Sequence, residues 1–186
     1  MAVISSEIVK TLRDKTGAGM MDCKRALEET NGDLELATDY LRKKGAAVAA
    51  KRAEKEANQG VIEAYIHAGS RVGAMVELNC ETDFVAKTPE FKQLAHDIAM
   101  QIAAMSPIFV SKENVDEATL QKELEIYKAQ AVNEGKRPEI AEKIAEGRLE
   151  KFYQEVCLLE QSFIKDSGKT IKDLLSDATG KVGEKI

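Results

Sequence analysis

The sequence predicts an α+β protein, built mainly of helices around a small antiparallel sheet. Apolar residues recur at spacings of three or four through most of the chain, as in helices that bury one face. They alternate at a spacing of two only between about residues 60 and 80, which is typical of strands. Glycine, proline and capping residues mark the ends of these segments. Hydrophobic residues make up 44% of the 186 residues and charged residues 32%, an ordinary balance for a globular chain.

Residues 1–45 are expected to form a compact module of three short helices. Ser5 or Ser6 can cap the first helix and Asp33 the third, because their side chains accept hydrogen bonds from the free N–H groups of a first turn. Each helix ends at a glycine, and these glycines lie in the turns at 16–19, 31–32 and 45. A module of this size is only marginally stable alone.

Residues 46–58 are expected to form a helical connector. They are rich in Ala, Lys and Glu, a composition that favours a solvated helix and a stiff spacer. The basic residues between Arg42 and Arg52 are an alternative phosphate-binding surface. No aromatic residue lies among them, and the chain is acidic overall, so a solvated helix face is the preferred interpretation.

Residues 59–186 are expected to form the α+β core domain, beginning with a β-hairpin. Two alternating segments, 60–67 and 72–80, flank the turn at 68–71. A lone hairpin is marginal in water, so helices or a third strand must cover it.

Four helices are expected after the hairpin. The first begins at Thr88–Glu90, where threonine is the cap, proline takes the first helical position and an acid lies in the first turn. The others are expected from Asp116 to Gly135, from Pro138 to Val156 and from Thr170 to Ala178.

Composition excludes several classes of protein. The 27 basic and 32 acidic residues give a net charge of −5, which argues against bulk nucleic-acid binding. No apolar stretch is long enough to span a membrane, and the N-terminus does not have the pattern of a signal peptide. Cys23, Cys80 and Cys157 are isolated and odd in number, so we expect neither disulfides nor a zinc site, and a cytoplasmic location.

No constellation of residues predicts an enzyme. Gly168–Thr170 resembles the end of a phosphate-binding loop, but the position that needs glycine is Phe163, and a turn before a helix is the preferred interpretation. His67 lies at the hairpin turn and His96 lies off the apolar stripe of its helix, so both are expected to be exposed. We therefore expect no catalytic residue, no cofactor and no metal.

Thr82–Val85 directly follows the second strand and allows two interpretations. In the structural one, Thr82 caps a turn, Asp83 accepts hydrogen bonds from nearby amides and Phe84 folds back into the core. In the other, Phe84 projects from a rigid corner beside a carboxylate, as anchors of protein-binding surfaces do. The pattern alone leaves both open.

Several segments, in order along essentially the whole chain, resemble those of one known family. Residues 16–24 (TGAGMMDCK) and 81–86 (ETDFVA) are similar to the two signatures of bacterial and organellar elongation factor Ts. The segment 138–156 also matches. The chain resembles the short form of this family, with one core subdomain and no long coiled-coil insertion. The resemblance implies a UBA-like N-terminal module and a closing strand after residues like 182–186, so we expect that strand to be missing here.

The resemblance also implies a function. Members of the family are guanine nucleotide exchange factors for elongation factor Tu, the GTPase that delivers aminoacyl-tRNA in translation. They act without a catalytic residue or cofactor of their own. By resemblance, Asp83 and Phe84 reach into the GTPase near its magnesium site, while Thr82 and Val85 shape and seat the corner.

A second contact with the GTPase is implied at the start of the second helix. The residues expected there are Gly17, Ala18, Gly19, Met20 and Met21, and His67 of the hairpin is expected to touch the partner as well. A homodimer in a two-by-two complex is the expected assembly, without direct contact to nucleic acid or membrane. The alternative function is a UBA-like adaptor without exchange activity, and the alternative location is an organelle matrix or stroma.

Overall fold

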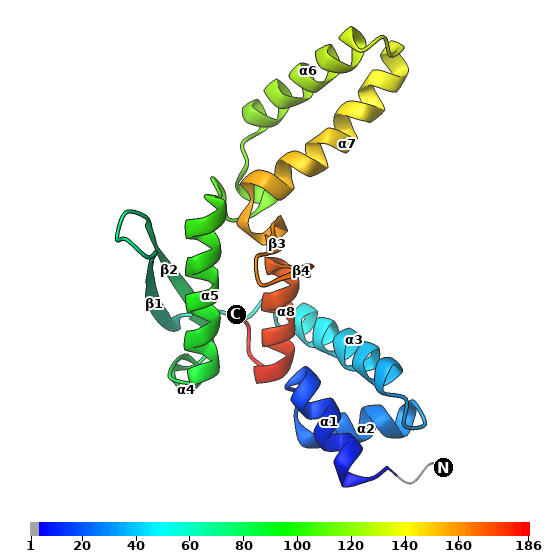
Figure 1. Cartoon of the computed structure of the whole chain (residues 1–186), viewed down its shortest axis with the longest axis vertical. Helices are drawn as coiled ribbons and strands as arrows, with labels where there is room; N and C mark the ends of the chain where they lie inside the picture. The colour runs from blue at the N-terminus through cyan, green and yellow to red at the C-terminus, as the bar shows by residue number, and fades with distance from the viewer. Residues whose placement is uncertain (1–3) are drawn as a thin grey trace. The chain divides into compact units, whose positions relative to one another are not determined.

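The computed structural model describes residues 4–186 and confirms the α+β class (Figure 1). Two compact units share the chain: one draws its described residues from Met1–Glu63, Glu77–Ala95 and Asp173–Ile186, the other from Ala64–Val76 and His96–Lys172. Between residues 4 and 186 the α-helices and strands are α1 (Ser6–Thr16), α2 (Met20–Glu29), α3 (Leu34–Arg52), β1 (Gln59–Ile66), β2 (Gly73–Cys80), α4 (Asp83–Ala86), α5 (Pro89–Met105), α6 (Glu117–Asn133), α7 (Pro138–Val156), β3 (Ser162–Phe163), β4 (Asp166–Thr170) and α8 (Ile171–Val182).

The first unit contains α1, α2 and α3, which pack around a small core. The Ser5 hydroxyl accepts a hydrogen bond from the N–H of Ile8 at 3.3 Å, and the Asp33 carboxylate accepts one from the N–H of Glu35 at 2.8 Å. These are the caps that the sequence predicts. The buried residues shared by the three helices are Val9, Leu12, Cys23, Ala26, Leu27 and Ala37.

The expected end of the third helix at Gly45 is wrong, because α3 continues to Arg52. Gly45 has a different use: α8 crosses α3 so closely that a Cβ built on Gly180 would lie 2.5 Å from the Gly45 Cα. Glycine at position 180 therefore permits the close approach of two helix backbones, and a Cβ on Gly45 would make only an ordinary contact of 3.7 Å with the Gly180 Cα.

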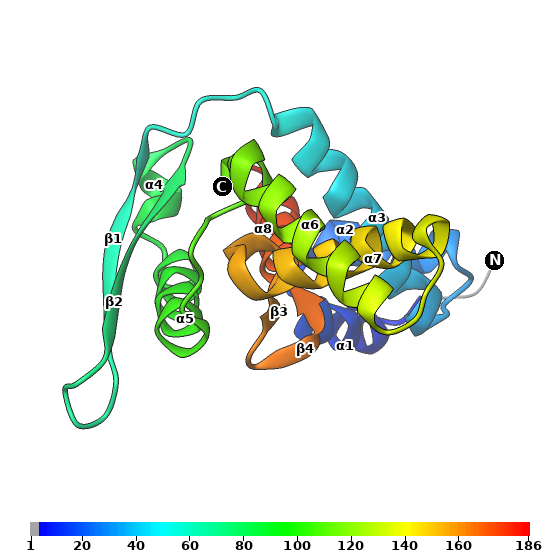
Figure 2. The ribbon, with the colours of Figure 1, turned by 90° about the horizontal axis from the view of Figure 1, so that it is seen from above.

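The β-hairpin forms as predicted, and the N–H of His67 closes its turn by donating to the carbonyl oxygen of Val72 at 2.8 Å. Helix α5 lies along one face of the two strands (Figure 2). In β1, the residues on the covered side are Val61, Glu63 and Tyr65, while Ile62 and Ile66 on the other side are 68% and 64% exposed. The hairpin thus has an apolar face that the described chain leaves open to solvent.

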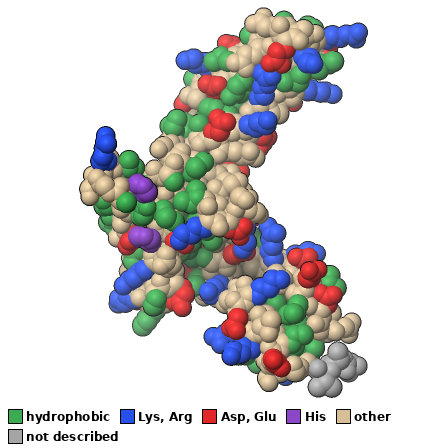
Figure 3. All heavy atoms as spheres, in the orientation of Figure 1, with side chains coloured by type: hydrophobic (Ala, Val, Ile, Leu, Met, Phe, Trp, Pro, Cys, Tyr) green, Lys and Arg blue, Asp and Glu red, His purple; other side chains and the backbone are tan. Residues whose placement is uncertain are grey.

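Helices α6 and α7 of the second unit pair with each other as an antiparallel helical hairpin (Figure 1). Lys128 contacts Glu142 at 2.7 Å and Arg148 contacts Glu134 at 2.8 Å, and Figure 3 shows basic and acidic side chains interspersed over this hairpin. Both helices lie where the sequence predicts them.

The pairing follows from the apolar positions of the two helices. The buried residues of α6 and α7 are small and allow close packing of the two helices: Ala131, Ala141 and Ala145. These helices consequently do not have to cover the sheet.

A buried pair of amides stabilises the base of the second unit. Gln101 and Gln161 are both fully buried, and the Gln101 amide donates to the Gln161 side-chain oxygen at 3.1 Å. The side-chain oxygen of Gln101 also accepts the N–H of Ile164 at 2.9 Å, which anchors the β3–β4 ribbon. Gly168–Thr170 lies in strand β4 rather than in the expected turn, and the last helix runs to Val182, beyond its predicted end.

Candidate functional site

Residues Thr82–Val85, called the corner below, join β2 to the four-residue helix α4. Thr82 has an extended backbone and caps α4, its hydroxyl accepting the N–H of Val85 at 3.5 Å. Its carbonyl oxygen accepts hydrogen bonds from the Cys80 thiol at 3.1 Å and from the N–H of Ala86 at 3.3 Å. The predicted role of Thr82 as a cap is confirmed.

Phe84 projects into solvent. Its side chain is 80% exposed, whereas Ala86, two residues further on, is 5% exposed. The interpretation in which Phe84 folds into the core is therefore wrong. A large apolar side chain held outward from a capped turn is a feature of protein-binding surfaces.

Asp83 lies beside Phe84 and forms an ion pair with Lys87, one helical turn further on, at 2.5 Å. This hydrogen bond, with the positive charge of Lys87, lowers the pKa of the Asp83 carboxyl below its ordinary value. About half of the Asp83 side chain stays exposed, so the corner presents a stably ionised carboxylate next to an aromatic ring.

The C-terminal segment contacts the corner, which sequence reasoning missed. Glu184 accepts hydrogen bonds from the Thr82 N–H at 3.0 Å and from the Thr82 hydroxyl at 2.7 Å. The N–H of Lys185 donates to the Glu81 carboxylate at 2.7 Å. No local signal reveals such a contact, because the two segments lie about a hundred residues apart in the chain.

The turn between α1 and α2 is a second candidate surface of the first unit. Gly17 ends α1 with a φ of +67°, a left-handed conformation that glycine adopts without strain, and Gly19 precedes α2. The methionines that begin α2 are exposed, Met20 by 46% and Met21 by 67%, while Ala18 is partly buried. Methionine adapts readily to different partners, so this turn also suits contact with another protein.

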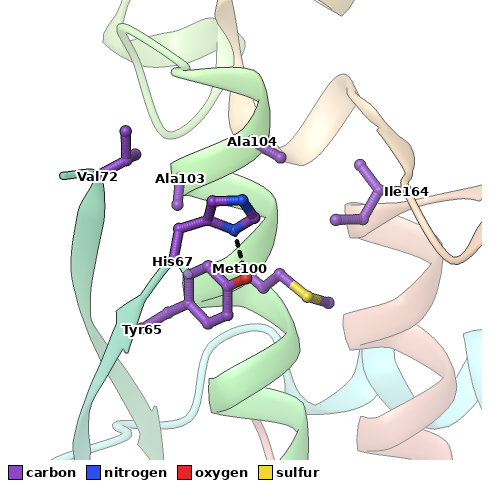
Figure 4. A pocket seen from close by; sticks show the side chains of 7 residues that line it. All are labelled: Tyr65, His67, Val72, Met100, Ala103, Ala104 and Ile164. Carbon is purple, nitrogen blue, oxygen red and sulfur yellow. Dashed lines mark hydrogen bonds between the residues drawn. The ribbon is translucent and has the colours of Figure 1, made fainter. Parts of the chain in front are cut away.

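His67 belongs to the second unit and is exposed, as predicted. Its Nδ1 lies 2.9 Å from the Tyr65 hydroxyl, and both residues line an apolar pocket of about 280 Å³ (Figure 4). His96 was expected to be exposed, but it is half-buried and packs edge-on against the Tyr65 ring at 5.6 Å. His96 is less exposed than expected because Tyr65 of β1 points toward α5 and its ring covers the imidazole.

The remaining chemistry-bearing residues are structural. Cys23, Cys80 and Cys157 are buried free thiols, and burial raises the pKa of each. Among residues 4–186, no cluster of three or more histidine, cysteine or carboxylate side chains has the arrangement of a metal site. No helix in the same range is long and apolar enough to cross a membrane.

An exposed aromatic on a capped corner and an exposed methionine pair are typical of proteins that bind another protein. Comparison with known proteins is more specific. Residues 5–186 match the profile of the family described as elongation factor TS.

Three relatives illustrate the similarity. Elongation factor Ts of Carboxydothermus hydrogenoformans is 61% identical over 99% of this chain and 85% of its own length. The corresponding proteins of Moorella thermoacetica and Caldanaerobacter subterraneus are 59% and 58% identical, over 99% of this chain and 91% and 92% of their own lengths. The chain therefore belongs to the elongation factor Ts family.

Proposed function

We propose that this protein is a guanine nucleotide exchange factor for elongation factor Tu and works in translation elongation in the cytoplasm. Membership of the elongation factor Ts family supports the partner and the activity. The observation that carries the assignment to particular residues is the 80% exposure of Phe84 on the corner. The protein acts by binding, without a covalent change of its own.

Exchange of this kind depends on differential affinity. A factor that binds the nucleotide-free GTPase more tightly than the GDP-bound form must lower the affinity for GDP by the same ratio. In the proposed mechanism Phe84 enters the GTPase as a wedge between its helices. Asp83 then disturbs the polar network around the magnesium ion of the GTPase. Loss of that ion removes a counter-charge of the phosphates, so GDP dissociates faster.

The second surface of the first unit would hold the GTPase while the corner acts. Gly17, Ala18 and Gly19 form the turn, and Met20 and Met21 offer adaptable apolar contact. We propose a further contact through His67 in the second unit, whose imidazole is exposed beside an apolar pocket. Both contacts favour complex formation without themselves expelling the nucleotide.

A homodimer is the proposed assembly, giving a two-by-two complex with the GTPase. It is supported by the uncovered apolar face of the hairpin, where Ile62, Ile66 and Met75 are 68%, 64% and 73% exposed. Exposed clusters of this kind commonly mark interfaces between subunits. Sedimentation of the purified chain at several concentrations tests this assembly.

Release of a fluorescent GDP analogue from elongation factor Tu, followed by stopped flow, tests the function. The chain should accelerate release strongly, and Phe84→Ala should remove most of the acceleration. Ile108→Ala is a matched control, because Ile108 is 72% exposed but lies in the other unit and outside the proposed contacts. If both variants lose activity equally, the effect is not specific to the corner.

The alternative function is an adaptor that binds through its three-helix module and exchanges no nucleotide. The exposed Met20 and Met21 favour it, because they belong to the three-helix module and could bind a partner without any contact from the corner. The adaptor would bind some other protein; it predicts that alanine at both methionines abolishes that binding, that Phe84→Ala leaves it unchanged, and that the wild-type chain does not accelerate GDP release from Tu. An exchange factor requires that Phe84→Ala lowers the GDP release rate.

A further inference from the structure

The polar groups of Thr82 are all engaged, and the C-terminal segment supplies two of the contacts. The Glu184 carboxylate receives the Thr82 N–H on one oxygen, at 3.0 Å, and the Thr82 hydroxyl on the other, at 2.7 Å. Such a two-pronged, charge-assisted contact fixes both position and orientation, because each oxygen restricts a different group of the same residue.

A second contact lies beside the first, and in it the C-terminal segment is the donor rather than the acceptor. Glu81 receives the N–H of Lys185 on one carboxylate oxygen and the Arg52 guanidinium on the other, both at 2.7 Å. The Lys185 ammonium also donates to the carbonyl oxygens of Ala53 and Lys55, each at 2.8 Å. Two consecutive residues after α8 are thereby tied to two consecutive residues of the corner region and to the end of α3.

The corner needs such an attachment. Helix α4 has four residues, too few for a helix to hold its own direction in water. Phe84 is 80% exposed and so receives little support from packing. The direction of the Phe84 ring therefore depends on how firmly the backbone at Thr82 is held.

We propose that Glu184 is a positioning residue for nucleotide exchange, holding Thr82 so that Phe84 and Asp83 point toward the GTPase. Glu184 makes no contact with the partner in this proposal, and it acts only through Thr82. The inference rests on the proposed exchange function, but the attachment itself is a property of the free chain. Each can therefore be tested separately.

The first test uses the free chain and needs no GTPase. Hydrogen exchange of the peptide that contains residues 82–86 is compared in wild type, Glu184→Ala and Glu184→Gln. Removal of the carboxylate should raise its exchange rate by about tenfold, as expected for loss of a charge-assisted hydrogen bond. Glutamine keeps one acceptor oxygen, so its rate should lie between those of the other two. Peptides from α6 and α7 should not change.

The second test measures GDP release from elongation factor Tu at increasing concentrations of each variant. Glu184→Ala should lower the maximal rate by about tenfold and leave the half-saturating concentration nearly unchanged, because the second surface still binds. Glu184→Gln should restore part of the maximal rate. Glu29→Ala, which removes an exposed glutamate of the same unit outside the attachment, is the matched control and should behave as wild type.

The outcomes separate the alternatives. A purely structural role of Glu184 would reduce the active fraction, raising the apparent half-saturating concentration while the maximal rate survives, and this would overturn the proposal. Unchanged hydrogen exchange at residues 82–86 would overturn it as well. A third outcome is that the wild-type chain fails to accelerate GDP release from Tu while Glu184→Ala still raises hydrogen exchange at residues 82–86. That result would overturn the exchange function and leave the attachment of the corner supported.

Discussion

At the scale of single residues, the corner places an exposed apolar ring next to a negatively charged carboxylate. Phe84 offers an exposed aromatic ring, and Asp83 offers a carboxylate whose pKa the neighbouring Lys87 lowers. Neither side chain is needed for packing of the chain itself. Their exposure leaves both available to a partner, as the proposed function requires.

Two phenylalanines of the first unit give a direct comparison of stability. Phe84 is 80% exposed and Phe91, at the start of α5, is 2% exposed. Phe91→Ala should destabilise the fold by about 3–5 kcal/mol, because it empties a packed core. Phe84→Ala should change the free energy of unfolding by less than about 0.5 kcal/mol. Urea titrations followed by circular dichroism measure both, and similar losses would show that Phe84 supports the fold.

The charge of Asp83 should not depend on pH in the working range. Its pKa is lowered in the folded chain, so its favourable interaction is present above the ordinary carboxyl pKa, about 3.9, and is lost only as pH falls through the folded value. The ratio of GDP release rates for wild type and Asp83→Asn should therefore stay constant from pH 6 to pH 8. A ratio that drifts across this range would indicate that another group titrates in the mechanism.

At the scale of elements, glycine decides how closely two helices pack. In α8, Gly180 faces the backbone of Gly45 in α3, and a Cβ there would lie 2.5 Å from the Gly45 Cα. In α7, a Cβ built on Gly147 would have no neighbouring atom within 4 Å. The two glycines have equal helix propensity but opposite surroundings.

Alanine at these two positions should have opposite effects on stability. Gly180→Ala should destabilise the chain by about 1–3 kcal/mol, because backbone atoms cannot move aside as a flexible side chain can. Gly147→Ala should stabilise it by about 0.5–1 kcal/mol, because alanine is the better helix former. Thermal unfolding of both variants tests the pair, and stabilisation by Gly180→Ala would contradict the close crossing of α3 and α8.

At the scale of the whole molecule, each compact unit is assembled from separate segments of the chain. The first unit joins the N-terminal helices to α8 through the Gly45–Gly180 crossing and the contacts of Glu184 and Lys185. The buried thiols report on both units, since Cys23 and Cys80 lie in the first and Cys157 in the second.

Thiol labelling should follow unfolding of the molecule. Burial raises the pKa of all three cysteines, so the folded chain holds their protons where exposed thiols would ionise. The native chain should react slowly with a disulfide reagent at pH 8, and all three thiols should react in denaturant. The same shift predicts that stability is lost as pH rises above the ordinary thiol pKa, about 8.5. Rapid labelling of the native chain would contradict the burial.

By itself, the sequence determined the elements with local signals and the family. The caps at Ser5, Asp33 and Thr82 and the proline start of α5 lie within a few residues of what they control, and the hairpin follows from alternation. The signatures at 16–24 and 81–86 were sufficient for the resemblance, which the comparisons confirm.

Only the tertiary structure decided how those elements are used. It extended α3 past Gly45, paired α6 with α7, selected the covered face of the hairpin and turned Phe84 outward. The physical reason is distance along the chain: Glu184 and Thr82 are 102 residues apart, and the helix that crosses Gly45 comes more than a hundred residues later. Burial and close packing depend on contacts between residues far apart in the sequence. Local secondary-structure propensity does not predict such contacts.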